Sequence, residues 1–218
     1  MKFEKARDLM IKNQLMPNDI NEKSILDVFY NVKKENFLPE NLRLNAYIDN
    51  EIYLDRNNSY LSNLNIARLI KFAEFSKNDK VLHIGALTGY VTSLISNFVS
   101  KVIALEKNID HFEILINNIK SYNLNNVQAF NLEYENLDQI KSKYDVIIID
   151  NIVDIIPEIL FNYLNPSNGK ILTLKKINNY LSKGIKITLN NNNQSNEIIF
   201  DCHTDKEPII KSNLNFVF

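Results

Sequence analysis

The chain has 218 residues, a formal net charge of −1 and only 4 glycines, where an average usage of about 7% would give roughly 15. Its content of 45% hydrophobic and 23% charged residues is sufficient for a packed core and argues against disorder. No apolar run approaches the roughly 18 residues of a membrane span, and the start MKFEKARDLM is charged, so we expect neither a transmembrane helix nor a secretory signal. The 25 basic and 26 acidic residues give no electrostatic reason to expect nucleic acid, and the single Cys202 excludes an internal disulfide framework. We therefore expect a cytoplasmic globular protein.

The first third of the chain is predicted to be helical. Apolar residues at helical spacing predict helices over residues 3–15, 22–32 and 63–75, with an irregular stretch near 39–58. Residues 1–75 are therefore expected to form a helical cap.

From residue 76 onward the chain alternates between strand-like and helix-like segments. Short apolar runs predict strands at 80–84, 101–105, 127–130, 144–150 and 170–174. Helical patterns lie between them at 88–98, 109–119 and 157–164. Near-continuous apolar strands separated by amphipathic helices are typical of a parallel sheet that is covered on both faces. Because its crossovers should be right-handed, we predict an α/β fold with a mostly parallel, doubly wound sheet.

The end of the chain has a different pattern. Apolar and polar residues alternate at 180–189 and at 196–201, which predicts an antiparallel hairpin at the sheet edge. The segment NNNNQSN at 190–196 is expected to be the long loop of this hairpin.

The first predicted strand opens into GALTGY at 85–90. Gly85, at the carboxyl end of the strand, lets the backbone turn tightly against a ligand, and Gly89 lets the next helix begin close to that ligand. The second strand ends in Glu106, and ligands of open α/β sheets bind beyond the carboxyl ends of the strands. Glu106 is therefore expected to face the same crevice as Gly85 and to accept hydrogen bonds from both hydroxyls of a ribose.

This arrangement suits a cofactor that contains a nucleoside. A dinucleotide would need the middle glycine of GxGxxG, and Leu87 stands in that neighbourhood, so an NAD-dependent oxidoreductase is disfavoured. S-adenosylmethionine carries no phosphate and makes smaller demands on the loop. The structural alternative is a tight strand–helix turn followed by a surface glutamate.

Several separated motifs resemble those of the protein-L-isoaspartate O-methyltransferase family, and they occur in the same order. Near the start, ARDLMIKNQ at 6–14 resembles ARxxMxxxQ, VKKENFLP at 32–39 resembles VPRExFVP, and Arg43 with AYID at 46–49 resembles R..AY.D. VLHIG at 81–85 followed by TGY at 88–90 is similar to the cofactor loop VLEIGTGSGY. Later matches are NV at 126–127 with Glu133, the segments 144–145 and 157–169, and the ending with Asp201, Pro208 and FVF at 216–218, which resembles a bacterial side branch.

The resemblance implies a Rossmann-like fold that binds S-adenosylmethionine, with a helical cap and substrate-side segment at 1–75 and the methyltransferase core at 76–218, in one compact unit. Gly85, Ala86 and Gly89 would line the methionine part of the cofactor, Glu106 would hold the ribose, and Glu133 would stand near the adenine. Tyr90 and Lys107 belong to the same expected cofactor site.

The implied reaction is methyl transfer to the free α-carboxylate of an isoaspartyl residue in a damaged peptide or protein. The acceptor is already an anion at pH 7 and the methyl group leaves a sulfonium cation, so no general base is required. Aligned approach of the two groups is most of what the protein must supply.

The sequence departs from the family pattern in three places. His83 replaces an acidic residue of the first strand, Leu87 replaces the middle glycine of the loop, and NSYLSNL at 58–64 replaces GQTISQP. Ser62 falls on the active-site serine of the family and is the candidate catalytic residue. A cofactor side that is kept better than the substrate side leaves two alternatives open, a catalytically degenerate relative that binds a partner or a methyltransferase of altered specificity.

The remaining candidates are single polar residues. Asp150 ends the fourth strand at the rim of the expected crevice and is a candidate substrate residue, with a helix N-cap as the competing interpretation. His83 is expected to be a hydrogen-bonded core residue, and His111 and His203 are expected at the surface. Because adjacent strand residues point to opposite faces, Cys202 and His203 are not expected to form a nucleophilic pair. No acidic cluster has the spacing of a metal site, so we expect no metal.

Overall fold

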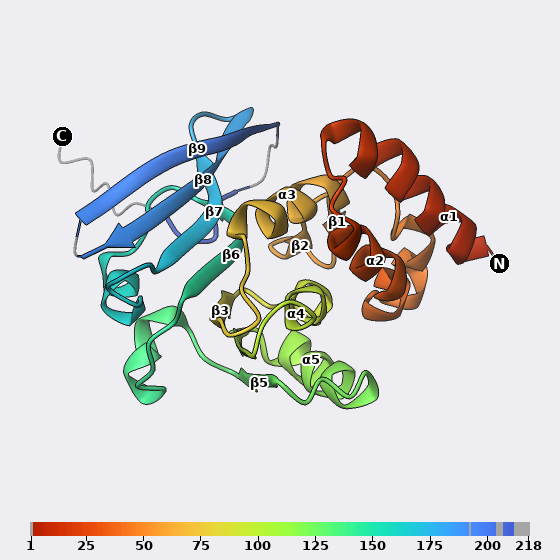
Figure 1. Cartoon of the computed structure of the whole chain (residues 1–218). Coiled ribbons are helices and arrows are strands. Elements are labelled where there is room, and N and C mark those ends of the chain that lie inside the picture. Colours follow the sequence, from red (N-terminus) through yellow and green to blue (C-terminus); the bar gives the residue numbers. More distant parts are fainter. Residues whose placement is uncertain (1, 192, 204–206, 212–218) are drawn as a thin grey trace, which may run out of the picture.

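The computed structural model describes residues 2–191, 193–203 and 207–211. At its centre lies a seven-stranded sheet with the spatial order β5-β4-β3-β6-β7-β8-β9 (Figure 1). The pairs from β5 to β7 are parallel, and β8 and β9 continue the sheet as an antiparallel hairpin. Strand order reverses at β3, so the predicted mostly parallel, doubly wound sheet is confirmed.

The strands of this sheet have the following bounds: β3 Lys80–Ile84, β4 Lys101–Leu105, β5 Val127–Phe130, β6 Val146–Val153, β7 Lys170–Lys176, β8 Leu181–Asn190 and β9 Asn193–His203. The first three match the predicted ranges. The prediction for the fourth strand is wrong at both ends, because β6 begins at Val146 and runs past Asp150 to Val153.

The predicted long loop at 190–196 is also wrong. Asn190 pairs with Asn193, Leu189 with Gln194 and Thr188 with Ser195, so the Asn-rich segment belongs largely to the strand ladder. Asn191 has a φ of +49°, a conformation that asparagine tolerates better than most residues and that tight hairpin turns require. The side chains of β9 are mostly exposed, which allows this edge strand to be polar.

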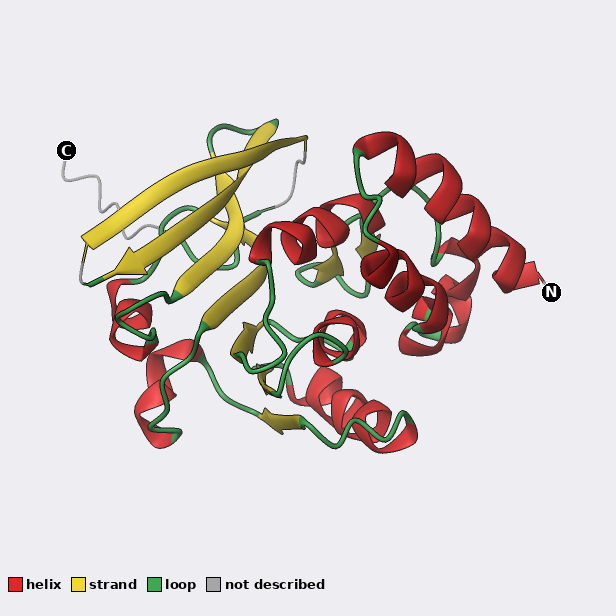
Figure 2. Cartoon of the chain, in the orientation of Figure 1, coloured by secondary structure: helices red, strands yellow, loops and turns green. Residues whose placement is uncertain are grey.

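The amino-terminal part is helical, as predicted, and packs beside the sheet (Figure 2). Its elements are α1 Lys2–Met10, a π-helical turn Ile11–Leu15, a 3₁₀ turn Met16–Asn18, α2 Lys23–Asn31, η3 Lys34–Phe37, η4 Glu40–Asn45, the short pair β1 Ile52–Tyr53 and β2 Ser59–Tyr60, and α3 Asn63–Ala73. The predicted helix over 3–15 is thus an α-helix only as far as Met10. In Figure 1, α3 lies between the sheet and the outer helices.

The crossover segments of the core are α4 Tyr90–Ser96, α5 Ile109–Ser121, η5 Tyr134–Gln139 and η6 Glu158–Tyr163. The segment predicted as a helix over 157–164 forms only 3₁₀ turns. Only seven residues lie between Pro157 and the Asn165-Pro166 step, and a residue before proline is disfavoured in α-helical conformation.

The two faces of the sheet bury separate apolar clusters, as the alternation of side chains along a strand requires. On β6, Val146, Ile148 and Ile152 pack with the amino-terminal helices and α3. Ile147 and Ile149 point to the other face, where η5 and η6 cover them.

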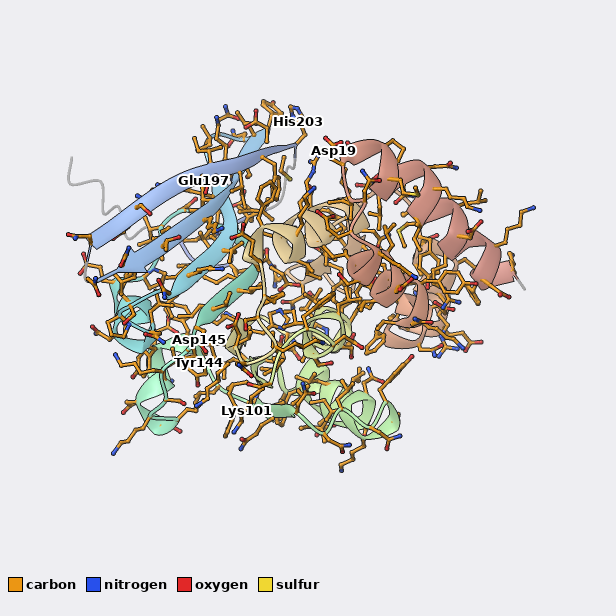
Figure 3. All side chains as sticks on the ribbon, viewed as in Figure 1. Asp19, Lys101, Tyr144, Asp145, Glu197 and His203 are labelled. Atoms are coloured by element: carbon orange, nitrogen blue, oxygen red, sulfur yellow. The ribbon has the colours of Figure 1, made fainter. Side chains whose placement is uncertain are left out.

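The amino-terminal ends of the parallel strands all lie at the same end of the sheet. Lys101 begins β4, and Tyr144 and Asp145 immediately precede β6 (Figure 3). The carboxyl ends lie at the opposite end, where the glycine-containing loop is found. Within the described residues, no helix combines the length and apolar character needed to span a membrane.

Candidate functional site

The loop after β3 has the tight geometry that its glycines predict. Gly85 and Gly89 have φ values of +81° and +96°, which favour glycine. The amides of Gly85 and Ala86 both donate to the carbonyl of Leu105, at 3.0 and 2.9 Å. A Cβ atom at Gly89 would lie 2.6 Å from Leu115 Cδ1, so the loop could not approach α5 as closely with a larger residue.

Leu87 adopts a conformation of the same kind without being glycine. Its φ is +49°, its side chain is 4% exposed, and its amide donates to Glu106 Oε2 at 2.7 Å. A left-handed conformation is unfavourable for a residue with a branched side chain. The backbone at position 87 therefore has the left-handed conformation that a glycine would adopt easily, although the residue there is leucine.

Glu106 follows β4 and is 2% exposed. Its Oε1 accepts from the amide of Asn108 at 2.8 Å, and its Oε2 accepts from the amide of Leu87. Burial raises the pKa of the carboxyl above its ordinary value, and the two backbone N–H groups oppose that rise. Among the described residues, these two bonds use about half of the roughly four acceptor positions of a carboxylate, so Glu106 can accept hydrogen bonds from a ligand.

An inner cavity of about 360 Å³ lies at the carboxyl ends of β3 and β4. Gly85 and Glu106 both line it, as the strand arrangement predicts. Lys107 and Glu133 also line it, and they form an ion pair of 3.7 Å in which both side chains are more than half exposed. Of the other residues predicted for the cofactor, Ala86, Gly89 and Tyr90 belong to the same turn but are not among the described residues that line the cavity.

A more open outer cavity of about 920 Å³ adjoins the inner one. Both are lined by Asn58, Lys107, Leu132, Glu133, Ile209 and Lys211. The outer cavity extends along the loop that carries Tyr53 and Arg56 and is rich in asparagine side chains. The site therefore consists of an inner space beside Glu106 and a wider polar mouth.

Ser62 lies at the N-cap of α3, where its Oγ accepts from the amide of Asn65 at 3.3 Å. It is not among the residues described as lining either cavity. Tyr60, two residues earlier, connects this segment to the loop after β3, because its hydroxyl bonds Thr88 Oγ1 at 2.7 Å and accepts from the amide of Tyr90 at 3.2 Å. The segment that contains Ser62 is therefore bonded, two residues earlier at Tyr60, to the loop between the two glycines.

Asp150 lies at an irregularity inside β6 rather than at its end. Between Ile149 and Ile152 the register with β7 shifts, and such bulges redirect side chains. The Asp150 carboxylate, 3% exposed, bonds His83 Nε2 at 2.9 Å, and His83 Nδ1 bonds Thr92 Oγ1 at 2.8 Å. His83 is therefore a hydrogen-bonded core residue, as predicted. Asp150 faces this buried histidine, so the expected place at the crevice rim is wrong.

Three further expectations concern isolated polar residues. The prediction that His111 lies at the surface is wrong, because it is 9% exposed and its Nε2 lies 3.5 Å from Asp55 Oδ2. Cys202 is buried whereas His203 is exposed, so these neighbours diverge as predicted. In the part of the chain that the structure describes, no group of three or more His, Cys, Asp or Glu side chains could hold a metal ion.

Sequence reasoning missed two contributions to the inner cavity. Asn151 lines it from the bulge in β6, beside the buried Asp150. Residues 209–211 also line it, and the amide of Ile209 donates to Ile152 O and the amide of Asp154 to Ile210 O, both at 2.9 Å. Ile209 Cδ1 lies 3.7 Å from the place that a Cβ atom of Gly85 would take. The closing FVF motif lies outside the described residues.

Comparisons of the sequence with known proteins agree with one another. Residues 5–206 match the family model described as protein-L-isoaspartate(D-aspartate) O-methyltransferase. A Petrotoga mobilis protein named protein-L-isoaspartate O-methyltransferase is 32% identical over 108 residues, which cover 50% of this chain and 51% of that protein. The chain spans about half the length of the first curated relatives that it matches.

Two solved structures have the same fold. One named protein-L-isoaspartate O-methyltransferase superposes with a TM-score of 0.72 at 20% identity, covering 95% of this chain and 66% of that one. A Plasmodium falciparum protein described under the same name, in complex with S-adenosyl-L-homocysteine, superposes with a TM-score of 0.70 at 18% identity. That match covers 94% of this chain and 98% of the other.

Proposed function

Because the chain belongs to the protein-L-isoaspartate(D-aspartate) O-methyltransferase family, we propose that it uses S-adenosylmethionine to methylate isoaspartyl residues in damaged proteins. The observation that carries the proposal is the buried carboxylate of Glu106. It lies beside the inner cavity with acceptor positions to spare, held by the amides of Leu87 and Asn108. A carboxylate fixed in this way suits the paired hydroxyls of a ribose.

The other cavity residues fit the same cofactor. Gly85 presents a wall without a side chain, and Lys107 and Glu133 offer polar groups at the rim, where an adenine edge would lie. When bound, S-adenosylmethionine supplies an electrophilic methyl group on a sulfonium centre. We assign Gly85, Ala86, Gly89 and Tyr90 to the turn that shapes the methionine end of this site.

On the substrate side, we propose that Ser62 contacts the reacting carboxylate. Its Oγ already accepts from the amide of Asn65, so its hydroxyl hydrogen can be donated to an anion. Asp150 is proposed to act on the substrate side only indirectly, by holding the bulge of β6 from which its neighbour Asn151 lines the inner cavity. The carboxylate of an isoaspartyl residue needs no base, so the work of these residues is to orient it.

Calorimetric titration with S-adenosylhomocysteine and transfer of a labelled methyl group to an isoaspartyl peptide test the proposal together. The matched control is the same peptide with a normal aspartyl residue. Binding and selective transfer to the isoaspartyl peptide support the proposed function. Binding without transfer would favour the degenerate relative or an altered specificity, and absence of heat at millimolar ligand would reject cofactor binding.

A further inference from the structure

A fully buried lysine lies between the two sides of the proposed site. Lys34 begins η3, and none of its surface is exposed. Its Nζ donates to Asn63 Oδ1 at 2.9 Å and lies over the rings of Tyr60 and Tyr90, at 5.5 and 5.2 Å from their centroids. Because an ammonium group is costly to bury, its contacts must compensate for the lost water.

Glu35, the next residue in sequence, is engaged by partners other than Lys34. Glu35 is paired with Arg7 at 3.5 Å and accepts a hydrogen bond from the hydroxyl of Tyr47. Among the described residues, Asp150 is the acid that acts on Lys34 through space. Burial lowers the pKa of Lys34 to about 7, against the opposing effect of Asp150.

The hydrogen bond to Asn63 fixes the beginning of α3. Asn63 is the first residue of that helix, is fully buried, and donates through Nδ2 to the carbonyl of Ala46 at 3.2 Å. Both ends of its carboxamide are therefore held. Since Ser62 is the N-cap immediately before it, the orientation of Asn63 constrains the backbone that carries Ser62.

The same turn that carries Lys34 also holds the cofactor loop. Thr88 Oγ1 donates to the carbonyl of Phe37 at 2.6 Å, and Phe37 is the last residue of η3. Thr88 also bonds the hydroxyl of Tyr60. One short turn thus contacts α3 through Lys34 and the loop between Gly85 and Gly89 through Phe37.

We propose that Lys34 is a positioning residue for methyl transfer, whose buried side-chain nitrogen fixes Asn63, and with it Ser62, relative to the loop between Gly85 and Gly89. The inference rests on the proposed function. Lys34 lines neither described cavity and acts through Asn63.

The variants Lys34→Met and Asn63→Leu, alone and combined, test the role of the pair, and exposed Lys33→Met is the matched control. Methionine keeps most of the length of lysine without its charge or its donors. We expect K34M to lower kcat/KM for an isoaspartyl peptide by about tenfold or more, because misplaced reacting groups can lose roughly a hundredfold in rate. Its affinity for S-adenosylhomocysteine should stay unchanged, since the contacts of Glu106 are intact. The double variant should lose little more than either single variant, because the two residues share one interaction.

Hydrogen exchange measured by mass spectrometry gives a readout that does not depend on activity. K34M is expected to raise exchange in peptides covering 60–66 and to leave those covering 101–106 unchanged. The positioning role would be overturned if K34M kept the kcat/KM of the wild type, or if the losses of the two single variants added up in the double variant. It would also be overturned if exchange at 60–66 stayed unchanged in K34M, or if K34M bound S-adenosylhomocysteine more weakly to the same extent as it lost activity. An inactive wild-type protein would instead reject the proposed function, and the exchange measurement would still decide whether Lys34 orders α3.

Discussion

The amide of Leu87 donates a hydrogen bond of 2.7 Å to Oε2 of Glu106, and it does so from a backbone with a φ of +49°. The same turn that strains Leu87 aims its N–H group at the buried carboxylate. A residue with a side chain pays about 1–2 kcal/mol for this conformation. The hydrogen bond that orients Glu106 therefore depends on the strained backbone conformation of Leu87.

Replacing Leu87 by glycine is expected to relieve the strain and to remove a side chain that is 4% exposed. Removing the buried leucine side chain lowers the free energy of unfolding by about 1.5–3 kcal/mol, whereas relief of the backbone strain raises it by about 1–2 kcal/mol. We therefore expect L87G to lower the free energy of unfolding by only about 1 kcal/mol, measured by urea denaturation. The control is L87A, which loses most of the same side chain but keeps the strain and should be the less stable of the two. An alanine variant more stable than the glycine variant would contradict strain at this position.

Removing the Glu106 carboxylate is expected to weaken cofactor binding. Hydrogen bonds to a charged group contribute about 1.5–3 kcal/mol each, so losing even one corresponds to roughly a tenfold loss of affinity or more. Calorimetry with S-adenosylhomocysteine on E106A measures this, and E113Q, on the exposed side of α5, is the control. Equal affinities of E106A and wild type would remove Glu106 from the cofactor site.

The parts of the fold that were predicted correctly depend on local patterns. The bounds of β3 and β4 follow from short apolar runs that begin at a lysine and end at the loop or at Glu106. The glycine positions likewise predicted the turn at 85–89, because Gly85 and Gly89 indeed adopt positive φ. Gly85 and Glu106 line the same cavity because each follows the carboxyl end of one of two neighbouring parallel strands. The alternation of strand-like and helix-like segments in the sequence already predicts that these strands are parallel.

The parts that were missed depend on distant contacts or on register. Asp150-Asn151 resembles the end of a strand in sequence, but a bulge carries the strand past it. His111 is buried, and its partner Asp55 is 56 residues away in an irregular loop. Ile209 lies against Gly85 through backbone pairing with β6, which local periodicity does not indicate.

The buried pair of Asp150 and His83 yields a stability prediction. Removing one partner of a buried pair leaves the other without its hydrogen bond, at a cost of about 3–5 kcal/mol for ionic pairs. We expect D150A to lower the free energy of unfolding by about 3 kcal/mol and D150N by clearly less, since the amide oxygen can still accept from His83 Nε2. Denaturant unfolding of the two variants measures this difference. If the alanine variant matched the asparagine variant, the bond to His83 would not be what stabilises this part of the core.

The lowered pKa of Lys34 predicts a pH dependence of stability. The pKa is about 7 in the folded protein and 10.5 in an unperturbed lysine, so unfolding takes up a proton between these values. The free energy of unfolding should therefore rise with pH from about 7 upward, by about 1.4 kcal/mol per pH unit between the two pKa values.

Urea denaturation of wild type and K34M at several pH values from 7 to 9 isolates this contribution, because other groups titrate alike in both proteins. K34M is expected to lack the rise and K33M to keep it. Parallel pH profiles of wild type and K34M would show that Lys34 stays protonated across this range.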